Sequence, residues 1–400
     1  MIQIKPNIDH EMYCLSCSTV LSPERVLWQG IHVCAVSICP ACRSEIVDDF
    51  QVGHAEMDPC RVNMTTGELL INNSYSRRWF GKPFLESLQN PRDYPGLTLK
   101  VEKFRDCKEV LILDCIDFLY GHSLLKLLNA EAYLNGNKEL GLVLLIPPFL
   151  RWMVPSGVAE IWTAKIPLAK ARNYYLQFNQ LLTRECERFE TIFLGRAHSH
   201  PKDFTIERFT GVEKHNFDKG VFRITFVWRE DRPWLDGWYL PKIVSKLGIA
   251  RPFLVLQNRR VRRLFSLMRH KFPHAIYTVA GLGTTTKFPS WIDDQRVRGF
   301  DENTEKKLCE IYAESRQVIG VHGSNMLLPS AHAGLTLDLM PITRWGNMVQ
   351  DILYQVKDSR MASHTYQYIP IGTRIDHLAH IASIQLEKYR SFRKWMVDMT

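Results

Sequence analysis

The sequence predicts an α/β protein with two Rossmann-like domains, preceded by a small zinc-ribbon-like module. Three observations support this prediction: two Cys-x-x-Cys pairs near the N-terminus, and two separate series of apolar strands that alternate with helices, over residues 108–194 and 221–340. We expect the parts of the chain to be the module (1–55), the first domain (56–215), the second domain (216–374) and a final helix that crosses back onto the first domain (375–400).

The predicted module contains the pairs Cys14–Cys17 and Cys39–Cys42. Thiolates at this spacing in two tight turns can converge on one tetrahedral Zn²⁺. Four cysteines leave no open coordination position, so we expect a structural zinc ion. Cys34 or His32 could replace one ligand. A disulfide pair or a redox motif is the competing interpretation, but the other cysteines are scattered singly, which is typical of a reducing compartment.

Composition and charge set broad limits on the function. The chain has 400 residues, of which 46% are hydrophobic, and a formal net charge of +9. This charge suits an anionic ligand, an anionic membrane surface or nucleic acid, and it does not choose among them. The N-terminal residues show no signal-peptide pattern, and the longest uncharged run, Leu140 to Leu150, is too short to span a bilayer. We therefore expect a cytoplasmic protein, possibly peripheral at the membrane.

Residues 108–194 have the pattern of a parallel sheet. Short apolar runs alternate with amphipathic segments, and right-handed crossovers would place the strands side by side. The expected strands are 109–114, 142–146, 159–163 and 191–194, and the expected helices are 122–134 and 168–189.

The loop after the first of these strands carries a candidate catalytic base. Asp117 and His122 lie at the predicted carboxyl edge of the sheet, close to Asp114. A histidine is suited to take a proton from a hydroxyl group near neutral pH, and a neighbouring aspartate can orient it. Either His122 or Asp117 is the candidate base. The alternative is that His122 only caps the helix that follows.

The second domain is predicted to begin with a strand over residues 221–228, which leads into Arg229 and Arg232. Guanidinium groups bind phosphate oxygens in pairs, so two arginines at a strand end are suited to a diphosphate. The alternative is a surface salt-bridge cluster with Glu230 and Asp231.

Residues 317–341 read QVIGVHGSNMLLPSAHAGLTLDLMP. This segment predicts a buried strand at 317–321, a turn, a helix start and a further strand at 335–340, after a helix at 302–315. A helix start at the carboxyl end of a parallel strand offers N–H groups to a phosphate. The candidate phosphate-binding residues are His322, Gly323, Ser324 and Asn325. A turn that serves only packing is the alternative.

The order of elements over residues 220–345 resembles the donor-binding half of GT-B glycosyltransferases. The segment GVHGSNMLLPSAHAG is similar to the His-Gly-(Ala/Ser) segment of the family 61 glycosyltransferases, which include xylosyltransferase-like enzymes, although Gly-Leu-Thr-Asn commonly follows there. The resemblance implies a GT-B-like fold and sugar transfer from a nucleotide-sugar donor to a hydroxyl acceptor on a glycan, a lipid-linked molecule or a protein. It also implies that Arg229 matches a diphosphate-binding arginine of fucosyltransferase-like enzymes.

We expect no catalytic metal, because no two aspartates stand in the Asp-x-Asp arrangement of metal-dependent GT-A enzymes. Two other functions remain open. One is a nucleotide-sugar epimerase of the same fold. The other is a nucleic-acid-binding module that uses the zinc ribbon and the basic segment 251–263. That segment lacks the interleaved aromatic residues that stack on bases, so nucleic acid is the less favoured partner.

Overall fold

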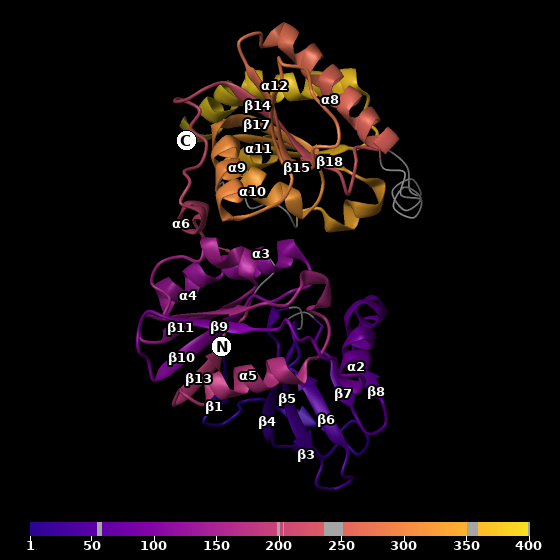
Figure 1. Ribbon diagram of the computed structural model, residues 1–400, viewed down its shortest axis with the longest axis vertical. Coiled ribbons are helices and arrows are strands. Elements are labelled where there is room, and N and C mark those ends of the chain that lie inside the picture. Colours follow the sequence, from indigo (N-terminus) through magenta and orange to yellow (C-terminus); the bar gives the residue numbers. More distant parts are fainter. Residues whose placement is uncertain (54–57, 198–200, 203, 236–250, 350–358, 399–400) are drawn as a thin grey trace. The chain divides into compact units, whose positions relative to one another are not determined.

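The computed structural model describes residues 1–53, 58–197, 201–202, 204–235, 251–349 and 359–398 (Figure 1). The chain divides into two compact units, residues 1–205 and 206–400. The boundary between them precedes the short helix α6 (Ile206–Thr210), whereas the sequence suggested a boundary after residue 215.

The first unit contains a six-stranded sheet in the order β1-β13-β10-β11-β12-β9. Its four central strands are parallel, and the edge strands β1 and β9 are antiparallel to their neighbours. The bounds are β1 (Ile2–Lys5), β9 (Leu99–Lys103), β10 (Glu109–Asp114), β11 (Gly141–Ile146), β12 (Glu160–Ala164) and β13 (Thr191–Leu194). The four predicted strands are confirmed. The edge strands were not predicted, because β9 is half exposed and has no continuous apolar run.

The helices of the first unit are α1 (Ser74–Ser76), η2 (Arg77–Gly81), α2 (Lys82–Gln89), α3 (Tyr120–Leu128), α4 (Ala130–Gly136), η3 (Pro148–Met153), η4 (Leu168–Lys170) and α5 (Leu176–Cys186). The prediction of one long helix over 168–189 is wrong. The chain leaves the helical conformation between η4 and α5, where Tyr174 and Tyr175 are both buried. The Tyr174 carbonyl accepts a hydrogen bond from the Arg92 N–H at 2.9 Å, so an outside partner satisfies this stretch of backbone.

An antiparallel sheet precedes these helices in the chain. It runs in the order β4 (Arg25–Trp28), β5 (Val33–Ile38), β6 (Glu45–Asp49), β7 (Arg61–Asn63) and β8 (Glu68–Leu70), and a hairpin of β2 (Met12–Tyr13) and β3 (Val20–Leu21) comes before it. The sheet therefore continues beyond residue 55, where the sequence analysis ended the N-terminal module.

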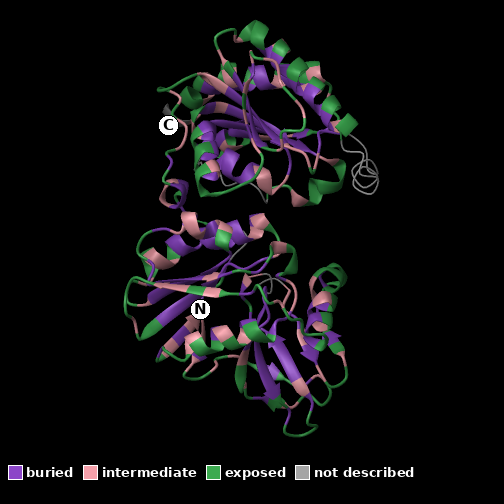
Figure 2. Cartoon of the chain, viewed as in Figure 1, coloured by how far each residue is buried: buried purple, intermediate pink, exposed green. Residues whose placement is uncertain are grey.

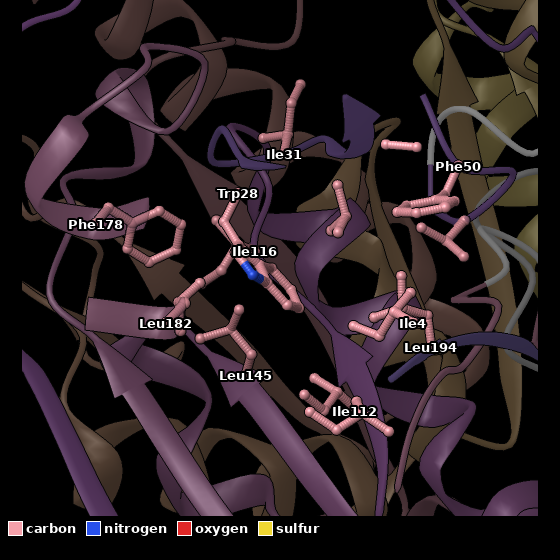
Figure 3. Close-up of a cluster of buried hydrophobic side chains, with 14 of the residues drawn as sticks. Ile4, Trp28, Ile31, Phe50, Ile112, Ile116, Leu145, Phe178, Leu182 and Leu194 are labelled. Atoms are coloured by element: carbon pink, nitrogen blue, oxygen red, sulfur yellow. The ribbon is translucent and has the colours of Figure 1, made fainter. Parts of the chain in front are cut away.

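One hydrophobic core joins the N-terminal strands to the parallel sheet. Trp28 and Phe50 belong to the same buried cluster as Ile112, Leu145 and Leu194, and Figure 3 shows their side chains together. The amide N–H of Trp28 also donates a hydrogen bond to Asn179 Oδ1 on α5 at 2.9 Å. The first 55 residues are thus an integral part of the first unit, because their apolar side chains are buried against it.

The second unit is built on a six-stranded parallel sheet in the order β16-β15-β14-β17-β18-β19. The chain runs from β14 outward to β16, then returns to the other side of β14 and runs outward to β19. The point where this direction reverses, between β14 and β17, is where open α/β sheets bind ligands. The bounds are β14 (Arg223–Arg229), β15 (Ile276–Leu282), β16 (Asp293–Val297), β17 (Ser315–Val321), β18 (Leu335–Met340) and β19 (Tyr366–Pro370).

Helices cover this sheet, and the last long helix packs within the second unit. Leu378 and Ala382 of α12 lie in the same buried cluster as Val261 and Phe265 of α8. We expected the final helix to cross onto the first domain, but its apolar residues pack against α8. The helices are α8 (Arg251–Lys271), α9 (Glu302–Glu314), η5 (Ser324–Met326), α10 (Leu327–His332), η6 (Ile342–Asn347), α11 (Ser359–Thr365), α12 (Ile375–Arg393) and η7 (Lys394–Asp398). No helix in the described ranges is both long enough and apolar enough to cross a bilayer.

Gly281 in β15 provides a test of the packing between β15 and β14. Its φ angle is +121°, and a Cβ atom there would lie 2.2 Å from the Trp228 carbonyl oxygen. We expect Gly281→Ala to lower the free energy of unfolding by about 2–4 kcal/mol, because it adds both backbone strain and a clash with main chain. Urea denaturation measures this change. In Gly299→Ala, the control, the new methyl group would meet nothing within 4 Å, and equal losses in the two variants would contradict the prediction.

Candidate functional site

The candidate site of the second unit lies at the reversal point of its sheet. Because β14 and β17 are adjacent and parallel, they end at the same edge. Arg229 is the last residue of β14, and His322 directly follows β17. We call the group formed by Arg229, Asp231, Arg232, His322, Gly323 and Asn325 the switch-point site.

Hydrogen bonds connect the two arginines to the turn that follows β17. Arg229 Nη1 donates to Asn325 Oδ1 at 2.5 Å, and Arg232 Nη1 donates to the His322 carbonyl oxygen at 2.7 Å. Arg229 also pairs with Asp231 through Nε, at 2.8 Å, and through Nη2. The structure therefore brings together the arginines and the His-Gly-Ser-Asn turn, which are almost a hundred positions apart in the sequence.

Gly323 allows the arginines to approach the backbone. Its φ angle is +146°, and a Cβ atom at this position would lie 2.7 Å from Arg232 Nη1 and 2.8 Å from Arg229 Nη1. Any side chain would displace both guanidinium groups. Two arginines that converge on one point thus require a glycine in the His-Gly pair. This requirement explains why the His-Gly pair could be recognised in the sequence.

Asp231 is the carboxylate that pairs with Arg229 in the switch-point site, whereas Glu230 accepts hydrogen bonds from Thr285. Burial acts to raise the pKa of Asp231, but the hydrogen bond and charge of Arg229 and the charge of Arg232 outweigh it and lower the pKa. The salt-bridge alternative is therefore met for Arg229, which forms an ion pair with Asp231.

The buried side chain of His322 fixes the turn that follows β17. Its side chain is only 1% exposed, and its Nδ1 lies 2.9 Å from Asp338 Oδ2, which also accepts the Tyr366 hydroxyl at 2.7 Å. Asp338 lies in β18 and Tyr366 in β19, so three neighbouring strands fix the orientation of the imidazole. The side chain of His322 anchors the turn, and its carbonyl group is the part that contacts an arginine.

Ser324 and Asn325 begin a very short helical segment. The predicted helix start is the 3₁₀ turn η5, followed by the six-residue helix α10, which contains Pro329. Such a short segment has little macrodipole, so the guanidinium groups supply most of the positive potential. Asn325 Nδ2 is buried and has no hydrogen-bond partner among the residues that the structure describes, while its Oδ1 accepts from Arg229. This unused donor marks a position where a ligand oxygen would be satisfied.

The first unit has a corresponding reversal point, between β10 and β13, where the order of the parallel strands changes direction. Asp114 is the last residue of β10, and Asp117 follows in the loop before α3. His122 lies in the first turn of α3, whose N-cap is Leu119. The structure thus places all three predicted side chains at the carboxyl edge of this sheet.

Asp117 is the centre of a buried charged group. Its Oδ1 accepts the Leu119 N–H at 3.0 Å, and its Oδ2 lies 3.1 Å from Lys126 Nζ. His122 Nδ1 lies 3.7 Å from Asp117 Oδ1, and the His122 side chain is 30% exposed, whereas that of Asp117 is fully buried. The imidazole is thus partly exposed and lies within ion-pair distance of the buried carboxylate.

Lys126 is the member of this buried charged group that the sequence analysis missed. Its side chain is 3% exposed, and its ammonium group also donates to the Ile116 carbonyl at 2.8 Å. The signal was a lysine inside the apolar run Ser-Leu-Leu-Lys-Leu-Leu, because a buried lysine requires an acidic partner. Burial raises the pKa of the neighbouring Asp114 to about 7, although the charge of Lys126 acts to lower it.

The four cysteines Cys14, Cys17, Cys39 and Cys42 form one cluster, with all Sγ atoms within 4.8 Å of one another. The sulfur atoms of Cys14 and Cys42 are 3.4 Å apart, and those of Cys17 and Cys39 are 3.5 Å apart. Tetrahedral thiolates bound at ~2.3 Å to one ion would be ~3.8 Å apart, so the cluster is close to the size that a metal requires. All four are free cysteines, which excludes the disulfide alternative here.

The two cysteine turns have the same construction. Each has an N–H to carbonyl bond of 2.9 Å back to its first cysteine, from Ser18 to Cys14 and from Arg43 to Cys39, and the donor residue has a positive φ angle. A hydroxyl group lies beside the second sulfur of each turn, Thr19 beside Cys17 and Ser44 beside Cys42. The Ser44 hydroxyl lowers the pKa of Cys42 to about 6, which favours the thiolate.

The two predicted substitutes for a ligand lie outside the cluster. His32 Nδ1 is 2.6 Å from Asp49 Oδ2, and both side chains are buried. Burial and the charge of Asp49 raise the pKa of the Cys34 thiol, so this residue is a neutral core side chain. A metal at this cluster would therefore have the four cysteines as its candidate ligands.

Comparison with known proteins adds only weak similarities. No protein-family model matches the chain, and no curated protein matches it. Among solved structures, it is similar to the Glycosylation Associate Protein (Gap123) complex from Streptococcus agalactiae, with 8% identity and a TM-score of 0.32 over 98% of this chain and 76% of that chain. It is also similar to TarM, with 9% identity and a TM-score of 0.26 over 97% of this chain and 74% of that chain. At these scores the likeness defines neither fold nor function.

The raised pKa of Asp114 gives a prediction for stability against pH. The unfolded carboxyl group titrates near pH 4, so between about pH 4 and pH 7 the folded state binds more protons, and stability falls as the pH rises. Asp114→Asn removes this slope while its side-chain oxygen still accepts the Ile116 N–H. We expect the variant to gain stability relative to wild type by up to about 1.4 kcal/mol per pH unit.

Urea denaturation at about pH 5 and about pH 7.5 measures this effect. Asp106→Asn, at an exposed position, serves as the control and should follow the wild-type dependence. If Asp114→Asn and wild type changed in parallel with pH, Asp114 would titrate normally.

Proposed function

We propose that this protein transfers a sugar from a nucleotide-sugar donor to a hydroxyl acceptor. The observation that carries the proposal is the convergence of Arg229 and Arg232 on the backbone of Gly323, at the reversal point of a six-stranded parallel sheet. This position is where such sheets bind nucleotides, and the guanidinium groups suit a diphosphate.

The proposed reaction forms a bond between the acceptor oxygen and the anomeric carbon of the sugar. The bond from that carbon to the diphosphate oxygen breaks, and the nucleoside diphosphate leaves with a new negative charge. Arg229 and Arg232 would stabilise this charge, which is the largest electrostatic requirement of the reaction. Gly323, Ser324 and Asn325 would contribute N–H groups and the unused amide donor of Asn325. Protein cations would thus perform the task that a metal performs in enzymes with Asp-x-Asp.

We assign the proton acceptor to the first unit. Between the two candidates, the geometry favours His122, because the Asp117 carboxylate is buried and occupied by Lys126 and the Leu119 N–H. Asp117 would then orient His122 and stabilise the imidazolium that forms. The acceptor would be a hydroxyl group on a glycan, a lipid-linked molecule or a protein.

We also propose that the four-cysteine cluster holds a structural Zn²⁺. Four thiolates in two turns of the same construction fit a tetrahedral ion, and a complete set of protein ligands leaves no position for a substrate. The hydroxyl groups of Thr19 and Ser44 would stabilise the thiolates as additional donors.

Metal analysis tests the zinc assignment. We expect about one zinc ion per chain, and we expect Cys39→Ser/Cys42→Ser to lose it and to melt at least roughly 6 °C lower, because the ion contributes to folding. Cys107→Ser, outside the cluster, should keep both the metal and the melting temperature. A full zinc content in the double variant would contradict the assignment.

Thermal denaturation with nucleotide sugars tests the donor site. A donor at a hundred times its dissociation constant should add about 2.7 kcal/mol to the stability of the protein. We expect this gain with one class among UDP-, GDP-, ADP- and CMP-sugars, and we expect Arg229→Ala to abolish it. Arg298→Ala removes an exposed arginine outside the switch-point site and should respond as wild type.

The same experiment separates the alternatives. An epimerase would also bind the donor, but it would convert the donor sugar without an acceptor. A nucleic-acid-binding module would show no stabilisation by any donor and would bind polynucleotide with a steep salt dependence. Either result would overturn sugar transfer as the function.

A further inference from the structure

The outer face of α8 in the second unit carries a group of exposed arginines. Arg259, Arg262 and Arg263, with Ser266 and Trp291, line an open hollow of about 530 Å³. Figure 1 shows α8 along the outside of the second unit, and Figure 2 shows that its outward side is exposed. We call the outward residues of this helix the α8 face.

The arginines lie on one side of the helix. Positions 259, 262, 263 and 266 have the i, i+3, i+4, i+7 spacing of a single helical face, and the opposite side carries the buried residues Leu254, Val261 and Leu264. Arg260, between them in the sequence, is not part of this face. That residue turns sideways, and its Nη1 donates to the Trp234 carbonyl at 2.8 Å.

Within the described part of the chain, no carboxylate pairs with the arginines of the α8 face. The sequence of α8 contains no aspartate or glutamate, and Arg259, Arg262, Arg263 and Arg269 form no ion pair with any described residue. By contrast, Arg223, Arg229 and Arg296 of the same unit are all paired with carboxylates. Neighbouring cations that repel one another favour an external anionic surface.

Apolar side chains share this face with the cations. Val255 and Leu256, one turn before Arg259, are 38% and 39% exposed. A helix that presents both arginines and aliphatic side chains matches a bilayer surface, where phosphates meet the cations and the acyl boundary receives the apolar groups. A single-stranded nucleic acid would stack its bases on a free aromatic surface, but Arg269 lies over the Trp291 ring at 5.3 Å.

We propose that the α8 face docks the protein on membranes that contain anionic phospholipids. The helix would lie parallel to the bilayer, with Arg259, Arg262 and Arg263 against the headgroup phosphates and with Val255 and Leu256 at the acyl boundary. This surface involves none of the residues of the switch-point site. The tests of membrane docking and of sugar transfer are therefore independent of each other.

Vesicle co-sedimentation of the full chain tests the docking. We expect binding to vesicles of phosphatidylcholine with about 30% phosphatidylserine and none to pure phosphatidylcholine, because the attraction is electrostatic. Binding should weaken between about 0.1 M and about 0.5 M salt. Each arginine near such a surface contributes about fivefold, so Arg259→Gln/Arg262→Gln/Arg263→Gln should bind on the order of a hundredfold more weakly.

Two further variants make the test specific. Arg298→Gln/Lys306→Gln/Lys307→Gln removes the same charge from exposed positions outside α8 and should bind within about threefold of wild type. Val255→Ser/Leu256→Ser should also weaken binding, and this loss should persist at high salt. Melting temperatures establish that every variant is folded.

Three results would overturn the proposal. The protein could fail to bind anionic vesicles, or the two triple variants could lose vesicle binding equally. The protein could also bind RNA but not vesicles, with RNA binding lost in the Arg259→Gln/Arg262→Gln/Arg263→Gln variant. The last result would assign the α8 face to nucleic acid.

Discussion

The parallel pairing of β14 with β17 is the constraint on which the switch-point site depends. It brings the ends of two strands to one edge, although the chain forms two other strands between them. Arg229 and Arg232 then meet a turn whose glycine has no side chain to oppose them. Loss of this pairing would separate the arginines from Asn325 and from the His322 carbonyl, and no local feature of either segment would restore the contact.

The two units differ in the charge that they place at corresponding positions. At the reversal point of the second unit, two guanidinium groups converge on the turn after β17, and one of them pairs with Asp231. At that of the first unit, Asp114 and Asp117 face Lys126, and His122 stands at the exposed margin. Removal of one partner from a buried ion pair costs several kcal/mol, so the Asp117–Lys126 pair fixes the loop before α3 against the helix that carries His122. The cationic position suits a diphosphate, and the acidic position suits proton transfer.

The sequence predicted the strands of the parallel sheets better than those of the antiparallel sheet. Strands β10, β13 and β18 were predicted with their observed bounds, because apolar residues predominate in each of them. The antiparallel strands β4 to β8 have less regular patterns, and β4, β5 and β6 bury part of their side chains in the core of the parallel sheet.

The sequence predicted the parts of the candidate sites that lie within one short segment better than the parts that depend on contacts between distant segments. The turn at Gly323 and the cysteine pairs carry their own spacing, so the sequence identified them. The contact of Arg229 with Asn325 was expected only from the order of the strands, and the pairing of Lys126 with Asp117 required the helix α3 to pack its lysine inward. Tertiary contacts decide such pairs, and no short motif records them.

The four-cysteine cluster connects to the candidate base through the core of the first unit. Asn63 of β7 donates from Nδ2 to Ser16 in the first cysteine turn at 2.8 Å, which links the hairpin β2–β3 to the antiparallel sheet. Cys14 and Cys39 belong to the same buried cluster as Trp28 and Ile112, and Ile112 lies two residues before Asp114 in β10. Because well-packed interiors transmit displacement, a metal ion that fixes the cysteine turns would also fix the support of β10 and of the loop that follows it. The four-cysteine cluster and the loop before α3 are therefore parts of one structural unit.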